Sequence, residues 1–83
     1  MTYKEAAEQA LACQDACNLS GVVHTFSEAV SAVWDEAHRT GEGTEWVNTH
    51  PICTMFITKI QSLNDYRASY PFVWDEVKKI AEG

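Results

Sequence analysis

Hydrophobic residues recur at helical spacing over most of this chain. Between Leu19 and His38 they follow the i, i+3, i+4, i+7 pattern that is typical of an amphipathic helix. Its members are Leu19, Val22, Val23, Phe26, Val30, Val33, Trp34 and Ala37. From Pro51 to about Asn64 the apolar residues cover more than one face, so this helix is expected to be the most buried. A last apolar stripe comprises Tyr70, Val73, Trp74, Val77, Ile80 and Ala81.

Local signals place the ends of these helices. Thr2 and Glu5 have the capping-box spacing, and an alanine-rich segment from Tyr3 to about Ala16 favours a first helix. Asn18 is a good N-cap for the second helix, and Gly41 can close it as a C-cap. No segment alternates with the period of two that strands require, so we predict no strands.

Two loops complete the predicted architecture. Gly41 to Glu45 reads as a polar loop, and Tyr66 to Ser69 as another. Asn48 or Thr49 is expected to cap the helix that follows, with Pro51 in its first turn. The sequence therefore predicts an all-α fold, a small bundle of three to four helices in one domain spanning residues 1–83.

Size and charge narrow the function classes. The chain has 83 residues and a formal net charge of −6, with 46% hydrophobic residues. Such a small domain buries a limited core, so a homodimer or a bound partner is expected to help cover its apolar surface. The acidity argues against direct nucleic-acid or anionic-membrane binding, which needs basic patches. It suits a basic protein partner, or it serves solubility alone.

The chain shows no membrane or export signal in its hydrophobic pattern. It has no run of about 18 apolar residues, the minimum for a spanning helix. The residues after Met1 form no apolar signal core. We therefore expect a cytoplasmic protein whose three cysteines stay reduced.

Cysteine and histidine residues offer an alternative, ligand-binding interpretation. Cys13 and Cys17 would share a helix face if the first helix continued that far, and His50 precedes Cys53 by three positions. The paired knuckles of structural zinc sites are missing, and buried cysteines often serve as small hydrophobes. We expect no bound metal and no cofactor. A small-ligand or metal site would use Cys17, His24, Asn48 and His50.

A cysteine enzyme is a further alternative. Cys17 stands at a helix start, where a dipole can lower a thiol pKa, with His24 or His50 as base and Asn48 as orienting group. The sequence has no oxyanion-loop signature and little room for a substrate cleft. We therefore expect no catalytic activity.

The stretch from Trp46 to Pro51 has two interpretations. It is typical of a helix N-terminus, with Trp46 as a hydrophobic staple and Asn48 and Thr49 as caps. As a recognition site, its free backbone amides would bind an anion and Trp46 and His50 would stack on a ring.

Acidic and aromatic residues suggest a surface for a protein partner. Aromatic side chains often anchor interfaces, and carboxylates steer a basic partner. The candidate partner-binding residues are Asp35, Glu36, Glu42, Glu45, Trp46, Tyr66 and Tyr70. The sequence Val-Trp-Asp-Glu occurs twice, from Val33 and from Val73, and either coincidence or duplication explains it.

Two segments resemble known sequences. Ala16–Phe26 (ACNLSGVVHTF) and Trp46–Ile52 (WVNTHPI) resemble stretches in small uncharacterised proteins of phages and other bacterial mobile elements. The resemblance covers about residues 10–64, and the group has no assigned activity, so no catalytic residues carry over. Inhibitors of bacterial defence systems, including anti-CRISPR proteins, are often small and acidic. The resemblance therefore implies a non-enzymatic module that binds and inhibits a host or defence protein.

Overall fold

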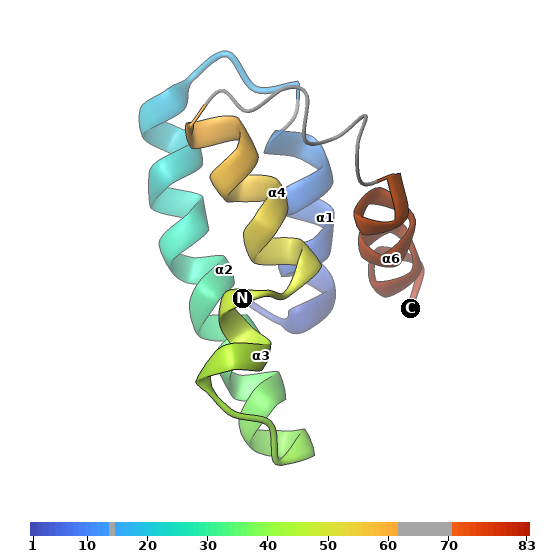
Figure 1. Ribbon diagram of the computed structural model, residues 1–83. Helices are drawn as coiled ribbons and strands as arrows, with labels where there is room; N and C mark the ends of the chain where they lie inside the picture. Colours follow the sequence, from blue (N-terminus) through green and yellow to red (C-terminus); the bar gives the residue numbers. More distant parts are fainter. Residues whose placement is uncertain (14, 62–70) are drawn as a thin grey trace.

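The computed structural model describes residues 1–13, 15–61 and 71–83. Within them the chain is helical and has no strand (Figure 1). The helices are α1 (Tyr3–Cys13), α2 (Leu19–Thr40), α3 (Thr44–Asn48), α4 (Pro51–Ile60) and α6 (Pro71–Glu82). The all-α class is confirmed, and the four longer helices lie where the sequence predicts them. The short α3 makes five helices among the described residues, one more than the predicted three to four. In this part of the chain, no helix is both long and apolar enough to cross a membrane.

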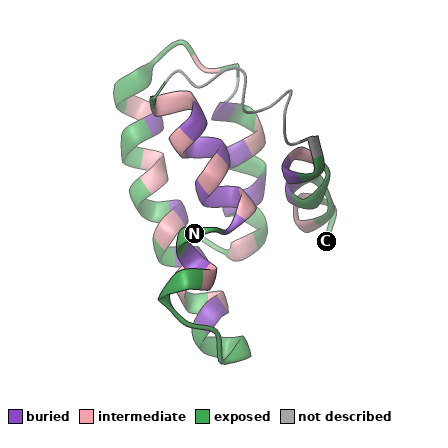
Figure 2. Ribbon diagram, in the orientation of Figure 1, coloured by how far each residue is buried: buried purple, intermediate pink, exposed green. Residues whose placement is uncertain are grey.

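The alanine-rich α1 packs against α2, α4 and α6. Its residues Ala6, Ala7 and Ala10 have no exposed surface, and their small side chains allow the neighbouring helices to approach closely. The larger core residues come from the other helices, among them Val33 of α2 and Phe56 of α4. Figure 2 shows the buried positions of α1 and α4 on the sides that face other helices.

The predicted caps of α1 and α2 are confirmed. The backbone N–H of Glu5 donates to the Thr2 hydroxyl at 3.1 Å, and the N–H of Thr2 donates to the Glu5 carboxylate at 3.4 Å. The Asn18 side chain accepts the N–H of Gly21 at 3.0 Å. Gly41 ends α2 with a φ of 80°, a left-handed conformation that favours glycine.

Two predicted boundaries are wrong. α1 ends at Cys13 instead of Ala16, because the chain tightens into turns whose bonds run from Asp15 to Ala12 and from Ala16 to Cys13. Cys13 and Cys17 therefore do not share a helix face. The expected loop from Gly41 to Glu45 is shortened by α3, which begins at Thr44.

The cap of α4 also differs from the prediction. His50 takes this position, whereas Asn48 and Thr49 end α3. The Thr49 backbone N–H and hydroxyl both donate to the carbonyl of Glu45, at 3.1 and 2.9 Å. The predicted loop at Tyr66–Ser69 and the predicted helix end at Asn64 lie outside the described residues.

Two apolar residues at the start of α2 do not enter the core. Leu19 is 51% exposed and Val23 is 46% exposed, although both belong to the predicted apolar stripe. The rest of that stripe is buried or half-buried, so the helix turns its first apolar positions toward solvent. The homodimer expected from the small size of the chain stays a prediction.

Candidate functional site

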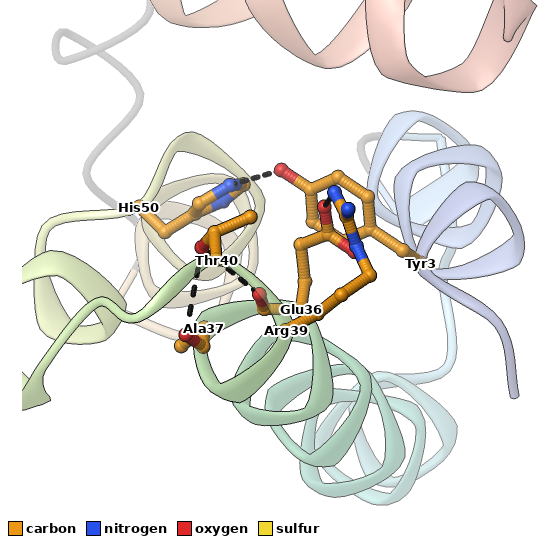
Figure 3. Close-up of polar contacts among 6 residues, drawn as sticks. All are labelled: Tyr3, Glu36, Ala37, Arg39, Thr40 and His50. Atoms are coloured by element: carbon orange, nitrogen blue, oxygen red, sulfur yellow. Dashed lines mark hydrogen bonds and ion pairs between the residues drawn. The ribbon is translucent and has the colours of Figure 1, made fainter.

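His50 is a buried polar residue at the junction between α3 and α4. Only 5% of its surface is exposed, and its extended backbone allows the side chain to fold back over the first turn of α4. Its Nδ1 accepts the backbone N–H of Ile52 at 3.1 Å. Its Nε2 lies 2.5 Å from the hydroxyl oxygen of Tyr3 (Figure 3). One imidazole therefore caps α4 and ties it to the beginning of α1.

These contacts assign the protonation of the imidazole. Because Nδ1 accepts a backbone N–H, it must carry a lone pair, and the proton of the neutral ring sits on Nε2. Nε2–H therefore donates to the Tyr3 oxygen. Both nitrogens are engaged within the fold, so neither is positioned to bind a metal or to act as a general base.

Two aromatic rings enclose the imidazole. The centroid of the Tyr3 ring lies 5.4 Å from that of His50, and the centroid of the Trp46 ring lies 4.7 Å away, both in edge-on arrangements. Burial lowers the pKa of His50 from 6.5 to about 4, against a weak opposing effect of the Glu36 carboxylate. Burial, and secondarily the Glu36 charge, raise the pKa of Tyr3 to about 12. Both groups are thus uncharged at neutral pH.

An ion pair from the last turns of α2 faces Tyr3 (Figure 3). Arg39 donates from Nε to Glu36 at 3.0 Å and from Nη2 to the second carboxylate oxygen. The hydrogen bond from Arg39 lowers the pKa of Glu36, which therefore stays ionised. We infer that Glu36 and Arg39 largely neutralise one another beside the Tyr3–His50 contact.

The predicted partner-binding residues separate into three groups. Asp35, Glu42 and Glu45 are exposed, the last two in the loop and short helix that follow α2. Glu36 is half-buried and paired with Arg39, and Trp46 is half-buried against His50. The other two candidates, Tyr66 and Tyr70, lie outside the described residues.

The structure does not gather the four predicted ligand-binding residues. Cys17 is exposed in the loop before α2, and His24 is exposed in α2, 3.5 Å from Glu28. His24 lies in the first two turns of α2, whereas Asn48 and His50 lie just before α4, and these two helices run antiparallel (Figure 1), so the structure does not bring the three residues together. Among the described residues no three His, Cys, Asp or Glu side chains are placed to hold one metal ion.

Two of the three cysteines belong to the core. Cys13 and Cys53 are buried, and the Cys13 thiol donates to the carbonyl of Ala10 at 2.9 Å. Burial raises the pKa of Cys53 to about 11, so its thiol is protonated and unreactive at neutral pH. Cys17 is the exposed one.

Sequence reasoning missed Tyr3 and Arg39 as members of this site. Tyr3 reaches His50 across 47 positions of sequence, and no local pattern signals such a contact. The i, i+3 spacing of Glu36 and Arg39 was the available signal for their ion pair.

The fold and site define a small all-helical domain whose buried histidine has a structural role. Comparisons of the chain with protein-family models, with curated proteins and with solved structures found no match.

Proposed function

We propose that this protein is a non-enzymatic module that binds a basic surface of a partner protein. The observation that carries the proposal is the distribution of charge along the chain. From Glu5 to His38 there is no lysine or arginine, so beyond Lys4 the charged residues of α1, of the turn after it and of most of α2 are carboxylates. These residues are Glu5, Glu8, Asp15, Glu28, Asp35 and Glu36.

The proposed contact surface lies where α2 ends. We call Asp35, Glu42 and Glu45 the acidic end; all three are exposed. The nearby cation Arg39 is already paired with Glu36, so it does little to offset their charge. A cluster of exposed carboxylates raises the rate of encounter with a basic partner and weakens binding to acidic competitors.

Binding is favoured over catalysis by the state of the reactive side chains. The nitrogens of His50 are engaged in internal hydrogen bonds, and the thiols of Cys13 and Cys53 are buried. The exposed Cys17 precedes α2 and His50 precedes α4, and because these two helices run antiparallel (Figure 1), the two residues do not form a thiolate–imidazole pair. A binding surface needs none of these groups.

The biological setting is proposed from the sequence resemblance. We propose a protein of phage or mobile-element origin that inhibits a host or defence protein, in the manner of small acidic inhibitors. A stable helical scaffold with an acidic contact surface is sufficient for such a role, because an inhibitor that blocks a binding surface needs no catalytic step.

The test begins with tagged full-length protein in a bacterial lysate. A captured partner is identified by mass spectrometry, and its Kd is then measured with purified components at low and high salt. For the double variant Glu42→Lys, Glu45→Lys we expect affinity to fall by about tenfold or more at low salt, since two favourable charge contacts become repulsive. The loss should shrink as salt screens the charges.

A matched control separates this surface from net charge. The double variant Asp75→Lys, Glu82→Lys makes the same change in net charge on exposed positions of α6. It should weaken binding much less than the reversal at Glu42 and Glu45. Equal losses in the two double variants would rule out the acidic end, as would unchanged affinity in both.

A further inference from the structure

A groove opens between the C-terminal half of α1 and the N-terminal half of α2. It holds a volume of about 190 Å³. Gln9, Ala12 and Ala16 form one wall, Gly21 and Val22 form the other, and Phe56 of α4 lies at its floor. We call it the α1–α2 groove. Its lining includes the first turns of α2, whereas the acidic end lies where α2 ends.

Gly21 has no conformational reason to be glycine. Its φ is not positive, unlike that of Gly41. A Cβ built at Gly21 would meet only the Asn18 side chain, at 3.4 Å or more, which is ordinary contact. Glycine within a helix costs about 0.5–1 kcal/mol relative to alanine. The feature that this glycine does provide is open space in the wall of the groove.

Three of the four polar side chains that line the groove are engaged within the fold, and the fourth, Gln9, is exposed at its rim. The Asn18 side chain caps the N–H of Gly21, and the Thr25 hydroxyl donates to the Gly21 carbonyl at 2.8 Å. The Cys13 thiol donates to Ala10 at 2.9 Å. A polar or charged occupant would therefore lose its hydration with little compensation, so the groove selects an apolar one.

The volume selects the size of that occupant. Pockets for drug-sized molecules and cofactors measure about 300–1,000 Å³, and a cavity of about 150 Å³ takes up benzene. At about 190 Å³ the α1–α2 groove matches one phenyl ring.

The charged residues near the groove indicate which kind of peptide segment would carry that ring. On the two helices that form the walls and the loop between them, Glu8, Asp15 and Glu28 are exposed within one helical turn of lining residues. No lysine or arginine occurs between residues 5 and 38, and against these three carboxylates α4 supplies one lysine, Lys59, three positions after Phe56. We propose that the α1–α2 groove receives a phenylalanine side chain from a basic segment of the partner protein.

This proposal rests on the proposed function in one respect, since the occupant belongs to a partner protein. It adds a second contact, in which an inserted ring supplies affinity and the carboxylates supply steering. Interface energy concentrates in such buried anchors, whereas charges at the rim contribute mainly to encounter rates.

The groove can be tested without the natural partner. The ¹⁵N-labelled full chain is titrated by NMR with the peptide acetyl-Lys-Phe-Lys-amide, and with acetyl-Lys-Ala-Lys-amide and acetyl-Glu-Phe-Glu-amide as controls. We expect saturable shifts of the amides of Ala12, Gly21 and Thr25 with the first peptide. The affinity of the alanine peptide should be lower by about tenfold or more, because this peptide lacks a ring to bury. The acidic peptide should also bind more weakly than the Lys-Phe-Lys peptide. Added salt should reduce this difference in affinity.

Variants assign the binding to the groove. Ala12→Leu places a larger apolar side chain in the wall of the groove. It should lower the affinity for the Lys-Phe-Lys peptide by about tenfold or more. Gly21→Ala should weaken it less, because it adds a single methyl group. Ser31→Leu adds a leucine at an exposed position of α2 that does not line the groove, and should leave the affinity unchanged.

Several results would overturn the proposal. Equal affinity for the phenylalanine and alanine peptides would exclude ring insertion, and equal affinity for the basic and acidic peptides would exclude the charge preference. Unchanged binding by Ala12→Leu would place the peptide elsewhere. Shifts of the same amides with protein concentration alone would instead assign the groove to a second copy of this chain.

The proposed function fails under different results. A partner that depends on Glu42 and Glu45, combined with a groove that binds no peptide, refutes only the groove. If the groove binds the peptide but charge reversal at Glu42 and Glu45 leaves the partner's affinity unchanged, only the acidic end is refuted.

Discussion

Replacing His50 with asparagine tests whether the buried imidazole stabilises this fold as a neutral group. Asparagine is among the best N-cap residues, so His50→Asn can retain the bond from the Ile52 backbone. Its shorter side chain cannot reach the Tyr3 hydroxyl or fill the space between Tyr3 and Trp46. The variant therefore removes the contact between α1 and α4, and with it the group that titrates.

The expected loss at neutral pH follows from these contacts. The hydrogen bond to Tyr3 contributes about 1 kcal/mol, and the edge-on ring contacts and the space left behind add about 1–2 kcal/mol. Unfolding free energy at pH 7 should therefore fall by about 2–3 kcal/mol. For a small domain with a few kcal/mol in total, this is a large fraction.

Acid should reduce this difference. The pKa of His50 is lowered from 6.5 to about 4 in the folded chain, so between these values the unfolded chain binds a proton that the folded chain does not. The stabilisation by His50 is complete above pH 6.5 and is lost as the pH falls toward 4. Over that interval the loss approaches about 3 kcal/mol. The wild-type and His50→Asn proteins should thus become similarly stable near pH 4.

Urea unfolding followed by tryptophan fluorescence, at several pH values between 7 and 4, measures this difference. Taking the difference between the two proteins removes the contribution of the carboxylates, including Glu36, which both retain. His24→Asn is the matched control, because His24 is exposed at the start of α2. Its difference from the wild type should be small at every pH. A constant gap between wild type and His50→Asn across the range would refute the assignment of His50 as a buried neutral group.

Three further predictions follow from the structure. Tyr3→Phe keeps the ring and deletes the oxygen that accepts the imidazole N–H, so thermal unfolding should show a loss of about 1–2 kcal/mol; an unchanged Tm would contradict that hydrogen bond. Gly21→Ala should stabilise the fold by about 0.5–1 kcal/mol in urea, and destabilisation would show that the Asn18 cap cannot accommodate the methyl. In a thiol titration Cys17 should react at once, and the buried Cys13 and Cys53 only after denaturation; rapid reaction of all three would contradict their burial.

The parts of the fold that follow local rules could be predicted from the sequence. The capping box at Thr2 and Glu5, the Asn18 cap and the left-handed Gly41 each depend on residues within one or two turns. The buried stripes of α2, α4 and α6 follow from helical periodicity. These features need no knowledge of the tertiary structure, so pattern and propensity were sufficient.

The site depended on contacts that the local sequence does not encode. Histidine is not among the favoured N-cap residues, so Asn48 and Thr49 were the better candidates on propensity alone. His50 takes the position because Tyr3 and Trp46 bury its ring, and this burial exists only in the assembled bundle. The short α3 was missed for a related reason. Five residues span little more than one helical turn, which is too short to show a repeating apolar pattern, and the buried Val47 shows that packing supports this helix.

Some residues of this chain are explained by their contribution to the stability of the fold, and others are not. Caps, buried stripes and the His50 cluster all stabilise the bundle. By contrast, three features contribute nothing evident to stability: the glycine at position 21, the exposed Leu19 and Val23, and the absence of lysine and arginine between residues 5 and 38. Like charges repel, and exposed apolar side chains gain nothing from the fold. These features all lie in the first two helices and the turn between them. Departures from folding rules tend to mark functional positions, so the α1–α2 hairpin is the part of this molecule to expect at an interface.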